Sequence, residues 1–278
     1  MRVRVVLAAM AVAAVLAGPA QAADRYTALG DSFAAGPLIP NPVAPLGCLK
    51  SSNNYGRIAQ RTLAFPEYRD ATCSGAETED MFAPQNVSPG GPNPPQLNSL
   101  STETKLVTLT IGGNDIGFSE LAQNCVSVLP FGSPCRDRYT RGGDQISARI
   151  TATAPQVSAV LDAIRARSPL AKILVVNYAA IFPHAPSNGC WPRMPVTPAD
   201  VRWLRSKHEE LNAMLATEAA RNNRATIVNV YGASVGRDAC AGSGTRWVEP
   251  YVPGNAAAPL HPNRRGMDAM AAMVVANR

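Results

Sequence analysis

Several motifs that carry cofactor or metal chemistry are absent from this 278-residue sequence. It has no P-loop, no glycine-rich dinucleotide fingerprint and no CxxC pair, and its three histidines lie far from the spacing that zinc sites require. Nothing in the sequence therefore points to a nucleotide-dependent or zinc-dependent class of protein. We expect neither a metal nor a cofactor.

Concentrated basic charge is also missing. The 26 lysines and arginines exceed the 20 acidic residues and give a formal net charge of +6, but they are scattered in short groups such as RRG, RDRYTR and RWLRSK. A nucleic-acid surface usually interleaves clustered basic residues with aromatic ones, and only 6% of this sequence is aromatic. We therefore expect no nucleic-acid partner.

Long apolar runs are scarce, and the clearest one is too short to cross a bilayer. Two arginines near the start precede an apolar core over residues 5–16, and the AQA triplet at 20–22 matches a small-x-small cleavage site. A transmembrane helix needs about 20 apolar residues. We therefore predict a secretory signal peptide over residues 1–22, an exported chain over 23–278 and no membrane insertion.

The sequence does contain an even number of cysteines. In an exported chain, such a set predicts three disulfides, because thiols are oxidised outside the cytosol. Zinc ligation is the alternative, but the cysteine spacing does not favour it. The simplest pairing joins neighbours in sequence, so that each bridge closes one loop: Cys48–Cys73, Cys125–Cys135 and Cys190–Cys240.

Strand and helix patterns alternate along the chain without an internal repeat. Strands are predicted at RYTALG, YRDATC, KLVTLTIGGND, AKILVVNY and ATIVNVY, and long amphipathic helices over 143–167 and 197–223. This alternation is typical of a doubly wound α/β sandwich around a parallel sheet, and we expect residues 23–278 to form one domain. Ligands bind such sheets beyond the carboxyl ends of strands, where Ser32 and Asn114 are placed.

Four short stretches carry candidate chemistry: Gly30-Asp31-Ser32, CSGAET with Gly75, GGND with Asn114, and HPN with His261. In order and position they resemble the four blocks of the SGNH, or GDSL, hydrolases over nearly the whole mature chain. The resemblance implies a flavodoxin-like α/β/α sandwich with a five-stranded parallel sheet. The six cysteines further resemble the secreted actinobacterial esterase and lipase branch of that family.

The resemblance implies a serine hydrolase mechanism, and the residue chemistry agrees with it. Ser32 is the expected nucleophile and His261 the base, while the Ser32 amide, the Gly75 amide and the Asn114 side chain are the expected oxyanion donors. Each motif also has a structural alternative. Ser32 could be a helix cap, Gly75 a turn glycine, and Asn114 or Asp115 a cap of the next helix.

The aspartate that the family usually carries three residues before the histidine is replaced by Ala258. A backbone carbonyl can accept the same hydrogen bond from the histidine ring, so we predict that a main-chain carbonyl near Ala258 orients His261. The alternative is a carboxylate from elsewhere, for which Asp31, Asp238 and Glu249 are the candidates.

The remaining histidines are expected to lie outside the chemistry. His208 stands among charged residues in RSKHEEL and is expected on a solvated helix face, and His184 in a loop. The predicted function is that of a secreted, monomeric serine esterase acting on a small or lipid ester. The alternatives are a lipase or phospholipase for longer acyl chains, a carbohydrate O-deacetylase, or a non-catalytic cell-envelope binding module.

Overall fold

The computed structural model describes residues 23–184, 189–223 and 225–278, so the predicted signal peptide over 1–22 lies outside the described residues. A central parallel sheet has the strand order β4-β1-β5-β6-β7, which is the flavodoxin-like order predicted from the resemblance. Its strands are β1 (Arg25–Gly30), β4 (Glu67–Asp70), β5 (Thr104–Thr110), β6 (Lys172–Val176) and β7 (Ala225–Val228).

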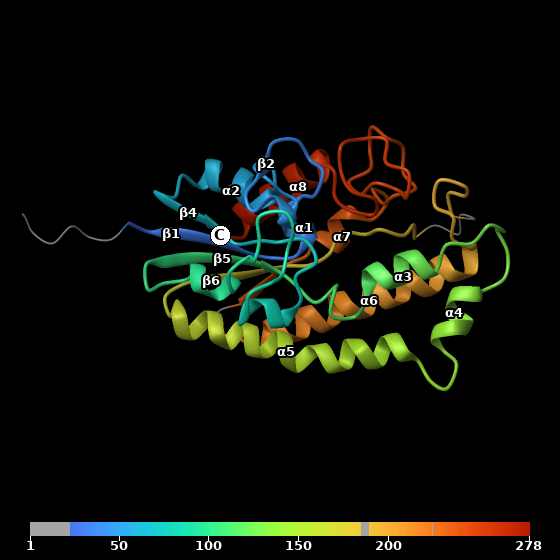
Figure 1. The fold of residues 1–278 in the computed structure, drawn as a ribbon, viewed down its shortest axis with the longest axis horizontal. Coiled ribbons are helices and arrows are strands. Elements are labelled where there is room, and N and C mark those ends of the chain that lie inside the picture. The colour runs from blue at the N-terminus through green and yellow to red at the C-terminus, as the bar shows by residue number, and fades with distance from the viewer. Residues whose placement is uncertain (1–22, 185–188, 224) are drawn as a thin grey trace, which may run out of the picture.

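Helices cover both faces of this sheet, as Figure 1 shows. On one face α2 (Tyr55–Leu63) packs against α8 (Arg264–Ala276), and on the other α5 (Gln145–Arg167) packs against α6 (Pro198–Arg221). The three-layer sandwich predicted from the alternation of strands and helices is therefore confirmed.

Several short elements decorate the carboxyl-terminal edge of the sheet and were not predicted from the sequence. They are α1 (Ser32–Ala35), α3 (Phe118–Asn124), α4 (Pro134–Tyr139), α7 (Val230–Ser234) and the antiparallel pair β2 (Pro42–Val43) and β3 (Lys50–Ser51). Each is too short to give a recognisable hydrophobic period.

The long elements follow the apolar pattern of the sequence. Leu106, Val107 and Leu109 of β5 are at most 1% exposed, as expected for a parallel strand covered on both faces. The apolar stripe predicted for the helix over 143–167 lies in the core along α5. Thr197 caps α6 by accepting a hydrogen bond from the Asp200 amide at 3.1 Å, and Pro198 takes the first helical position.

The three predicted disulfides are present with the predicted pairing: Cys48–Cys73, Cys125–Cys135 and Cys190–Cys240. The first joins the loop after β2 to the segment that follows β4, two residues before Gly75. The other two close loops at the same edge of the sheet. The cysteines therefore restrain the connections around the predicted site rather than the sheet itself.

The proline-rich segment over 81–100 is ordered and is tied to the central strand. Gln96 is fully buried, its Oε1 accepts from the Gly30 amide at 2.7 Å, and its Nε2 donates to the Gly30 carbonyl at 3.0 Å. The amide side chain thus replaces a strand neighbour at the last residue of β1. Because buried backbone groups need partners, this contact holds the end of β1 in place.

Replacing Gln96 by leucine would bury the Gly30 amide without its partner. We expect Gln96→Leu to lower the free energy of unfolding by about 1–3 kcal/mol, measured by urea denaturation. Asn98→Leu, a similar change at an exposed position of the same turn, serves as the control and should change it by less than about 0.5 kcal/mol. Equal effects of the two substitutions would contradict this role of Gln96.

Candidate active site

The predicted nucleophile lies at a sharp turn at the carboxyl end of β1. Gly30 has a φ of +141°, and a side chain there would place its Cβ 2.4 Å from the Thr110 carbonyl oxygen, so only glycine fits. The Asp31 side chain then accepts from the Phe33 amide at 2.9 Å and caps α1. Ser32 is the first residue of this helix, where its own amide has no intrahelical acceptor.

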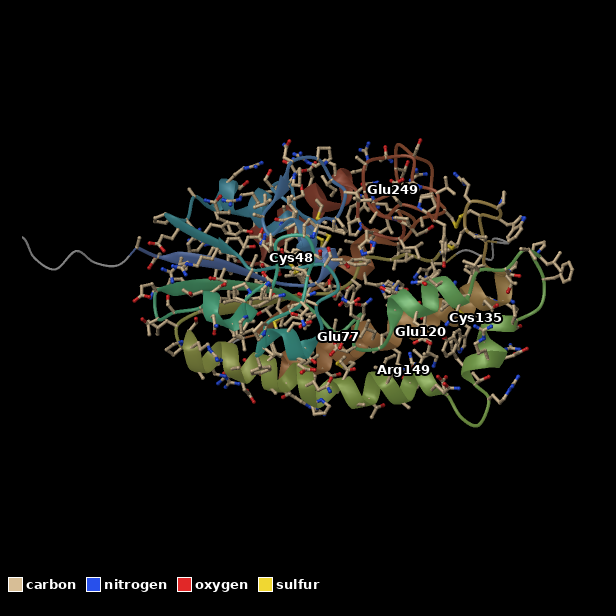
Figure 2. The ribbon with its side chains drawn as sticks, in the orientation of Figure 1. Cys48, Glu77, Glu120, Cys135, Arg149 and Glu249 are labelled. Carbon is tan, nitrogen blue, oxygen red and sulfur yellow. A yellow bond between two sulfur atoms is a disulfide. The ribbon has the colours of Figure 1, made fainter. Side chains whose placement is uncertain are left out.

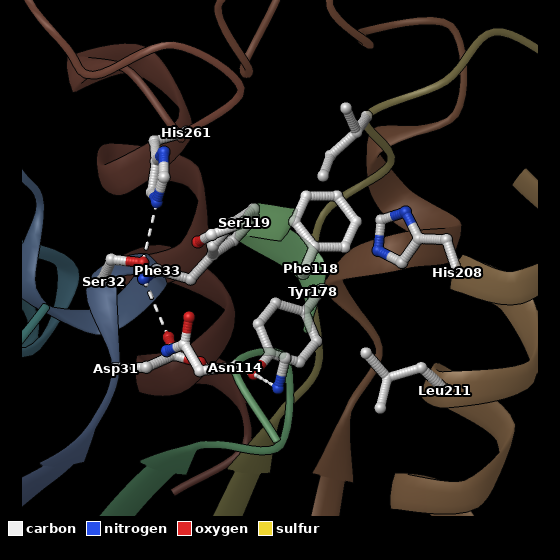
Figure 3. A pocket seen from close by; sticks show the side chains of 12 residues that line it. Asp31, Ser32, Phe33, Asn114, Phe118, Ser119, Tyr178, His208, Leu211 and His261 are labelled. Atoms are coloured by element: carbon white, nitrogen blue, oxygen red, sulfur yellow. Dashed lines mark hydrogen bonds between the residues drawn. The ribbon is translucent and has the colours of Figure 1, made fainter. Parts of the chain in front are cut away.

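The hydroxyl of Ser32 meets the ring of His261. The Ser32 Oγ lies 2.7 Å from the His261 Nε2, although the two residues are 229 positions apart in sequence. Figure 3 shows this contact at one end of a cavity. His261 stands just before α8, whose amino terminus is capped by Asn263. The structure therefore brings the two predicted catalytic residues together in the geometry of a nucleophile and its base.

The other ring nitrogen of His261 is held by the backbone. The Nδ1 lies 2.7 Å from the carbonyl oxygen of Pro259, to which it donates. This corrects the sequence prediction by one residue, because the Ala258 carbonyl instead accepts from the His261 backbone amide at 3.2 Å. A proton fixed on Nδ1 leaves the lone pair of Nε2 directed at Ser32.

None of the three candidate carboxylates is hydrogen-bonded to the His261 ring. Asp31 faces Tyr178, and Asp238 accepts from the Cys240 amide at 2.9 Å. Glu249 is fully buried and pairs with Arg246 at 2.7 Å. Within the described part of the chain, the hydrogen bond that orients His261 therefore comes from a carbonyl and not from a carboxylate.

The surroundings of His261 favour the neutral ring. Burial lowers the pKa of His261 below its usual value of 6.5, and the hydrogen bond to Pro259 only partly opposes this. A neutral imidazole at neutral pH can accept the proton of the Ser32 hydroxyl.

The loop after β5 and the loop that carries Gly75 are tied to each other. The Asn114 Nδ2 donates to the Ala76 carbonyl at 2.9 Å, and the amide of Thr78 donates to the Asp115 carboxylate at 3.0 Å. Neither Asn114 nor Asp115 caps the next helix, as the structural alternative supposed, because α3 is preceded by Gly117. Since an amide group carries two N–H bonds, Asn114 keeps one for a ligand.

A cavity adjoins Ser32. Its lining combines the predicted catalytic pair with aromatic and aliphatic side chains, which are Asp31, Ser32, Phe33, Gly113, Asn114, Phe118, Ser119, Tyr178, Ile181, His208, Leu211 and His261. Gly75 is not part of this lining; it is exposed and has a φ of +80°. Ser32, Asn114 and His261 are thus gathered at one cavity, whereas Gly75 is linked to it through the next residue, Ala76, whose carbonyl accepts from Asn114.

Helix α3, which carries Phe118 and Ser119 of the cavity lining, is held by contacts with α4 and α5. Glu120 of α3 accepts from Arg149 of α5 at 3.0 Å and from the Tyr139 hydroxyl at 2.9 Å. Figure 2 shows Glu120 and Arg149 between these two helices. This ion pair fixes the short helix that forms one side of the cavity.

A buried network behind the nucleophile was not predicted from the sequence. The Tyr178 hydroxyl donates to the Asp31 Oδ2 at 2.5 Å and accepts from the Gly113 amide at 2.7 Å. Burial raises the pKa of Asp31 to about 7, although the hydrogen bonds from Tyr178 and Phe33 oppose the rise. The network links the turn of Ser32 to the turn of Asn114. Tyr178 is the last residue of the predicted strand AKILVVNY and lies just beyond the end of β6, so its place at the same edge was the available signal.

The two other histidines differ from each other. His208, expected on a solvated helix face, is 3% exposed and lines the cavity, because this face of α6 packs onto the sheet edge. His184 remains in a loop as predicted, and its ring contacts the Tyr231 hydroxyl at 2.9 Å. Among the described residues, no group of three His, Cys, Asp or Glu side chains is arranged to hold a metal ion.

The loop before His261 depends on the buried pair of Arg246 and Glu249. The Glu249 carboxylate also accepts from Asn255 at 2.7 Å and from Asn263 at 2.6 Å. Although burial opposes ionisation, the hydrogen bonds from these three side chains lower the pKa of Glu249 to about 2. The Glu249 backbone further pairs with His261 and Leu260, each at 3.0 Å. Glu249 therefore supports the position of His261 without touching its ring.

Neutralising Glu249 should therefore affect stability far more than chemistry. We expect Glu249→Gln to lower the free energy of unfolding by about 3–5 kcal/mol, because Arg246 would be left buried and unpaired. In the folded fraction, kcat should fall much less than the ~10⁴-fold loss that accompanies removal of a triad aspartate.

Urea denaturation and kcat normalised to folded protein measure the two effects. Asp268→Asn, which breaks the exposed pair with Arg264 at 2.9 Å, is the control and should cost less than about 1 kcal/mol. A ~10⁴-fold loss of kcat in folded Glu249→Gln would make Glu249 part of the catalytic unit.

Comparison with known proteins agrees with this geometry. Residues 28–269 match the GDSL-like lipase/acylhydrolase family. Lipase 2 of Streptomyces coelicolor is 40% identical over 264 residues, which cover 92% of this chain and 86% of the relative.

Two solved structures share the fold. An extracellular lipase from Streptomyces rimosus aligns with a TM-score of 0.72 and 26% identity, over 92% of this chain and 99% of the other. A phospholipase A1 from Streptomyces albidoflavus aligns with a TM-score of 0.75 over the same shares of the two chains, and at 24% identity that likeness concerns the fold. This chain belongs to the GDSL-like lipase/acylhydrolase family and is a carboxylic ester hydrolase.

Proposed function

We propose that the protein is a secreted serine esterase that forms an acyl-enzyme on Ser32, with His261 as the general base. The observation that carries the proposal is the 2.7 Å contact between the Ser32 Oγ and the His261 Nε2. The Pro259 carbonyl, 2.7 Å from the Nδ1, supports it by fixing the tautomer that a base requires.

In the acylation step, the Ser32 Oγ attacks the ester carbonyl carbon while its proton passes to the His261 Nε2. The carbonyl oxygen takes up the electron pair and becomes an oxyanion. The Ser32 amide, the free N–H of Asn114 and the Gly75 amide are the donors we assign to it. The intermediate then collapses, the bond to the alcohol oxygen breaks, and the imidazolium returns the proton to that oxygen.

Deacylation repeats these steps with water. His261 takes a proton from the water as it attacks the acyl carbon, and the same donors stabilise the second oxyanion. The bond to the Ser32 Oγ then breaks and Oγ regains its proton, which releases the carboxylic acid. The imidazolium is charged only transiently, and its Nδ1 proton then points at a carbonyl dipole rather than a full negative charge.

The cavity beside Ser32 supports binding of the acyl group. The leaving oxygen must lie within reach of His261 to receive its proton, so the alcohol part occupies the open side near that ring. The acyl part then extends past Phe33 and Tyr178 toward the apolar interior. Two acyl lengths are compared: a short group would end beside Phe33 and Tyr178, and a longer one, which the name of the relative, Lipase 2, supports, would continue toward His208. Hydrolysis rates across esters of increasing acyl length decide between these two preferences.

Three observations support secretion. The predicted signal over 1–22 precedes the domain that we propose for residues 23–278, and three disulfides persist best in an oxidising compartment. The relative from Streptomyces rimosus is an extracellular lipase.

In the described ranges, the helices lack the combined length and apolarity needed to span a bilayer.

The nucleophile is tested by covalent labelling. A fluorophosphonate should add to Ser32 in the wild type, as mass spectrometry of the modified peptide would show, and Ser32→Ala should abolish the label and lower kcat by roughly 10⁴–10⁶-fold. Ser119→Ala, another serine of the same cavity, is the matched control and should retain the label at Ser32. A wild type that resists the reagent would instead support a non-catalytic binding module.

The oxyanion donor is tested by Asn114→Ala. We expect kcat to fall by roughly 10²–10³ with little change in KM, because the donor acts on charge that develops in the transition state. Thr78→Val is the control, since it breaks a tie between the same two loops and leaves the Asn114 amide intact. A change confined to KM would make Asn114 a substrate-binding residue instead.

A further inference from the structure

His208 is a buried polar side chain without a partner. It projects from α6, is 3% exposed, and neither of its ring nitrogens has a hydrogen-bond partner among the described residues. Although its neighbours Lys207 and Glu209 are charged, His208 lies at helical spacing from the buried Leu204, Leu211 and Leu215 of α6. Figure 3 shows the ring at the far end of the cavity from His261.

The ring sits in an aromatic cage. Its centroid lies 5.2 Å from that of Tyr231, 6.3 Å from those of Phe118 and Tyr178, and 6.4 Å from that of Phe182. The two tyrosine hydroxyls are used elsewhere. That of Tyr178 bonds with Asp31 and Gly113, and that of Tyr231 with Glu209 and His184. Neither tyrosine hydroxyl of the cage is hydrogen-bonded to a His208 nitrogen.

An apolar side chain would suit this cage better if packing were its only purpose. A buried polar atom without a partner destabilises the folded protein, and His208 carries two such atoms. Burial lowers the pKa of His208 to about 3, so the ring is neutral and presents one N–H donor and one lone pair. His208 and two rings of the cage, Phe118 and Tyr178, also line the cavity that contains Ser32.

We propose that His208 is a substrate-binding residue that donates its ring N–H to an oxygen atom carried along the acyl chain, so that the enzyme prefers acyl groups with an oxo or hydroxyl substituent. The inference rests on the proposed esterase function, because it assumes that the acyl part enters the cavity from Ser32. The apolar lining by Phe118, Ile181 and Leu211 would hold the hydrocarbon part of the same chain.

The reach of the histidine predicts a dependence on position. An acyl chain attached at Ser32 passes His208 at one depth only, so one carbon of the chain comes within hydrogen-bond distance of the ring. A substituent at any other carbon would be buried without a partner and would weaken binding. A site built for a hydrogen bond thereby discriminates both against chains that lack the oxygen and against chains that carry it at the wrong carbon.

The test scans one oxygen along the acyl chain. The ethyl esters of octanoate and of its oxo derivatives, substituted in turn from C3 to C7, are compared by kcat/KM. The wild type should favour one position over its neighbours by about tenfold, as expected for one buried hydrogen bond. His208→Leu should abolish this maximum, and His208→Gln, which retains an N–H donor, should restore a position-dependent maximum.

Stability separates binding from a structural role. Removal of two unpaired nitrogens should leave the melting temperature of His208→Leu equal to that of the wild type or higher. A lower melting temperature together with a uniform loss of kcat/KM over all esters would show that His208 only packs the core. His184→Leu is the matched control, because His184 also contacts Tyr231 but does not line the cavity, and it should keep the wild-type profile.

Failure of the inference differs from failure of the proposed function. A flat profile in the wild type, with unsubstituted octanoate hydrolysed and Ser32 labelled, would overturn the role of His208 alone. Absence of both hydrolysis and labelling would overturn the proposed function and with it this inference.

Discussion

The hydrogen bond between Ser32 and His261 is the constraint on which the rest of the site depends. It joins the end of the first sheet strand to a loop near the end of the chain, 229 residues later, within 2.7 Å. Neither side chain is placed by its own neighbours in sequence alone. The contact requires that the turn after β1 and the loop before α8 be fixed independently to within a fraction of an ångström, because proton transfer depends steeply on distance.

Two buried polar networks provide that precision. On the nucleophile side, Tyr178 bridges Asp31 and the Gly113 amide, so the turns at the ends of β1 and β5 move as one unit. On the base side, the Glu249 carboxylate gathers Arg246, Asn255 and Asn263 below the loop of His261. Asp31 and Tyr178 in the first network and Arg246, Glu249 and Asn263 in the second are buried, and such networks specify one arrangement because a displaced buried member would leave a polar atom without a partner.

A backbone carbonyl orients the ring of His261. The Pro259 carbonyl accepts a hydrogen bond from the Nδ1 proton, which fixes the tautomer. A carbonyl carries only a partial negative charge, so it stabilises the imidazolium of the transition state less than a carboxylate would. Burial also disfavours the imidazolium, because it lowers the pKa of His261. The ring and the hydroxyl are thus kept neutral, and in the mechanism we propose the oxyanion donors supply much of the charge stabilisation.

The sequence by itself determined the parallel sheet, the long helices and the number of disulfides, because hydrophobic period, caps and an even cysteine count are local signals. The simplest cysteine pairing was confirmed only by the structure. It also indicated Ser32, Asn114 and His261, since each motif directly follows a strand or precedes the last helix. The tertiary structure decided the rest. The path of one turn places the carbonyl of Pro259, rather than that of Ala258, against the His261 Nδ1. Asp115 bonds to Thr78 because a loop distant in sequence approaches it. His208 is buried because its face of α6 packs against the edge of the sheet. Such contacts join residues far apart in sequence, and no local pattern encodes their distance.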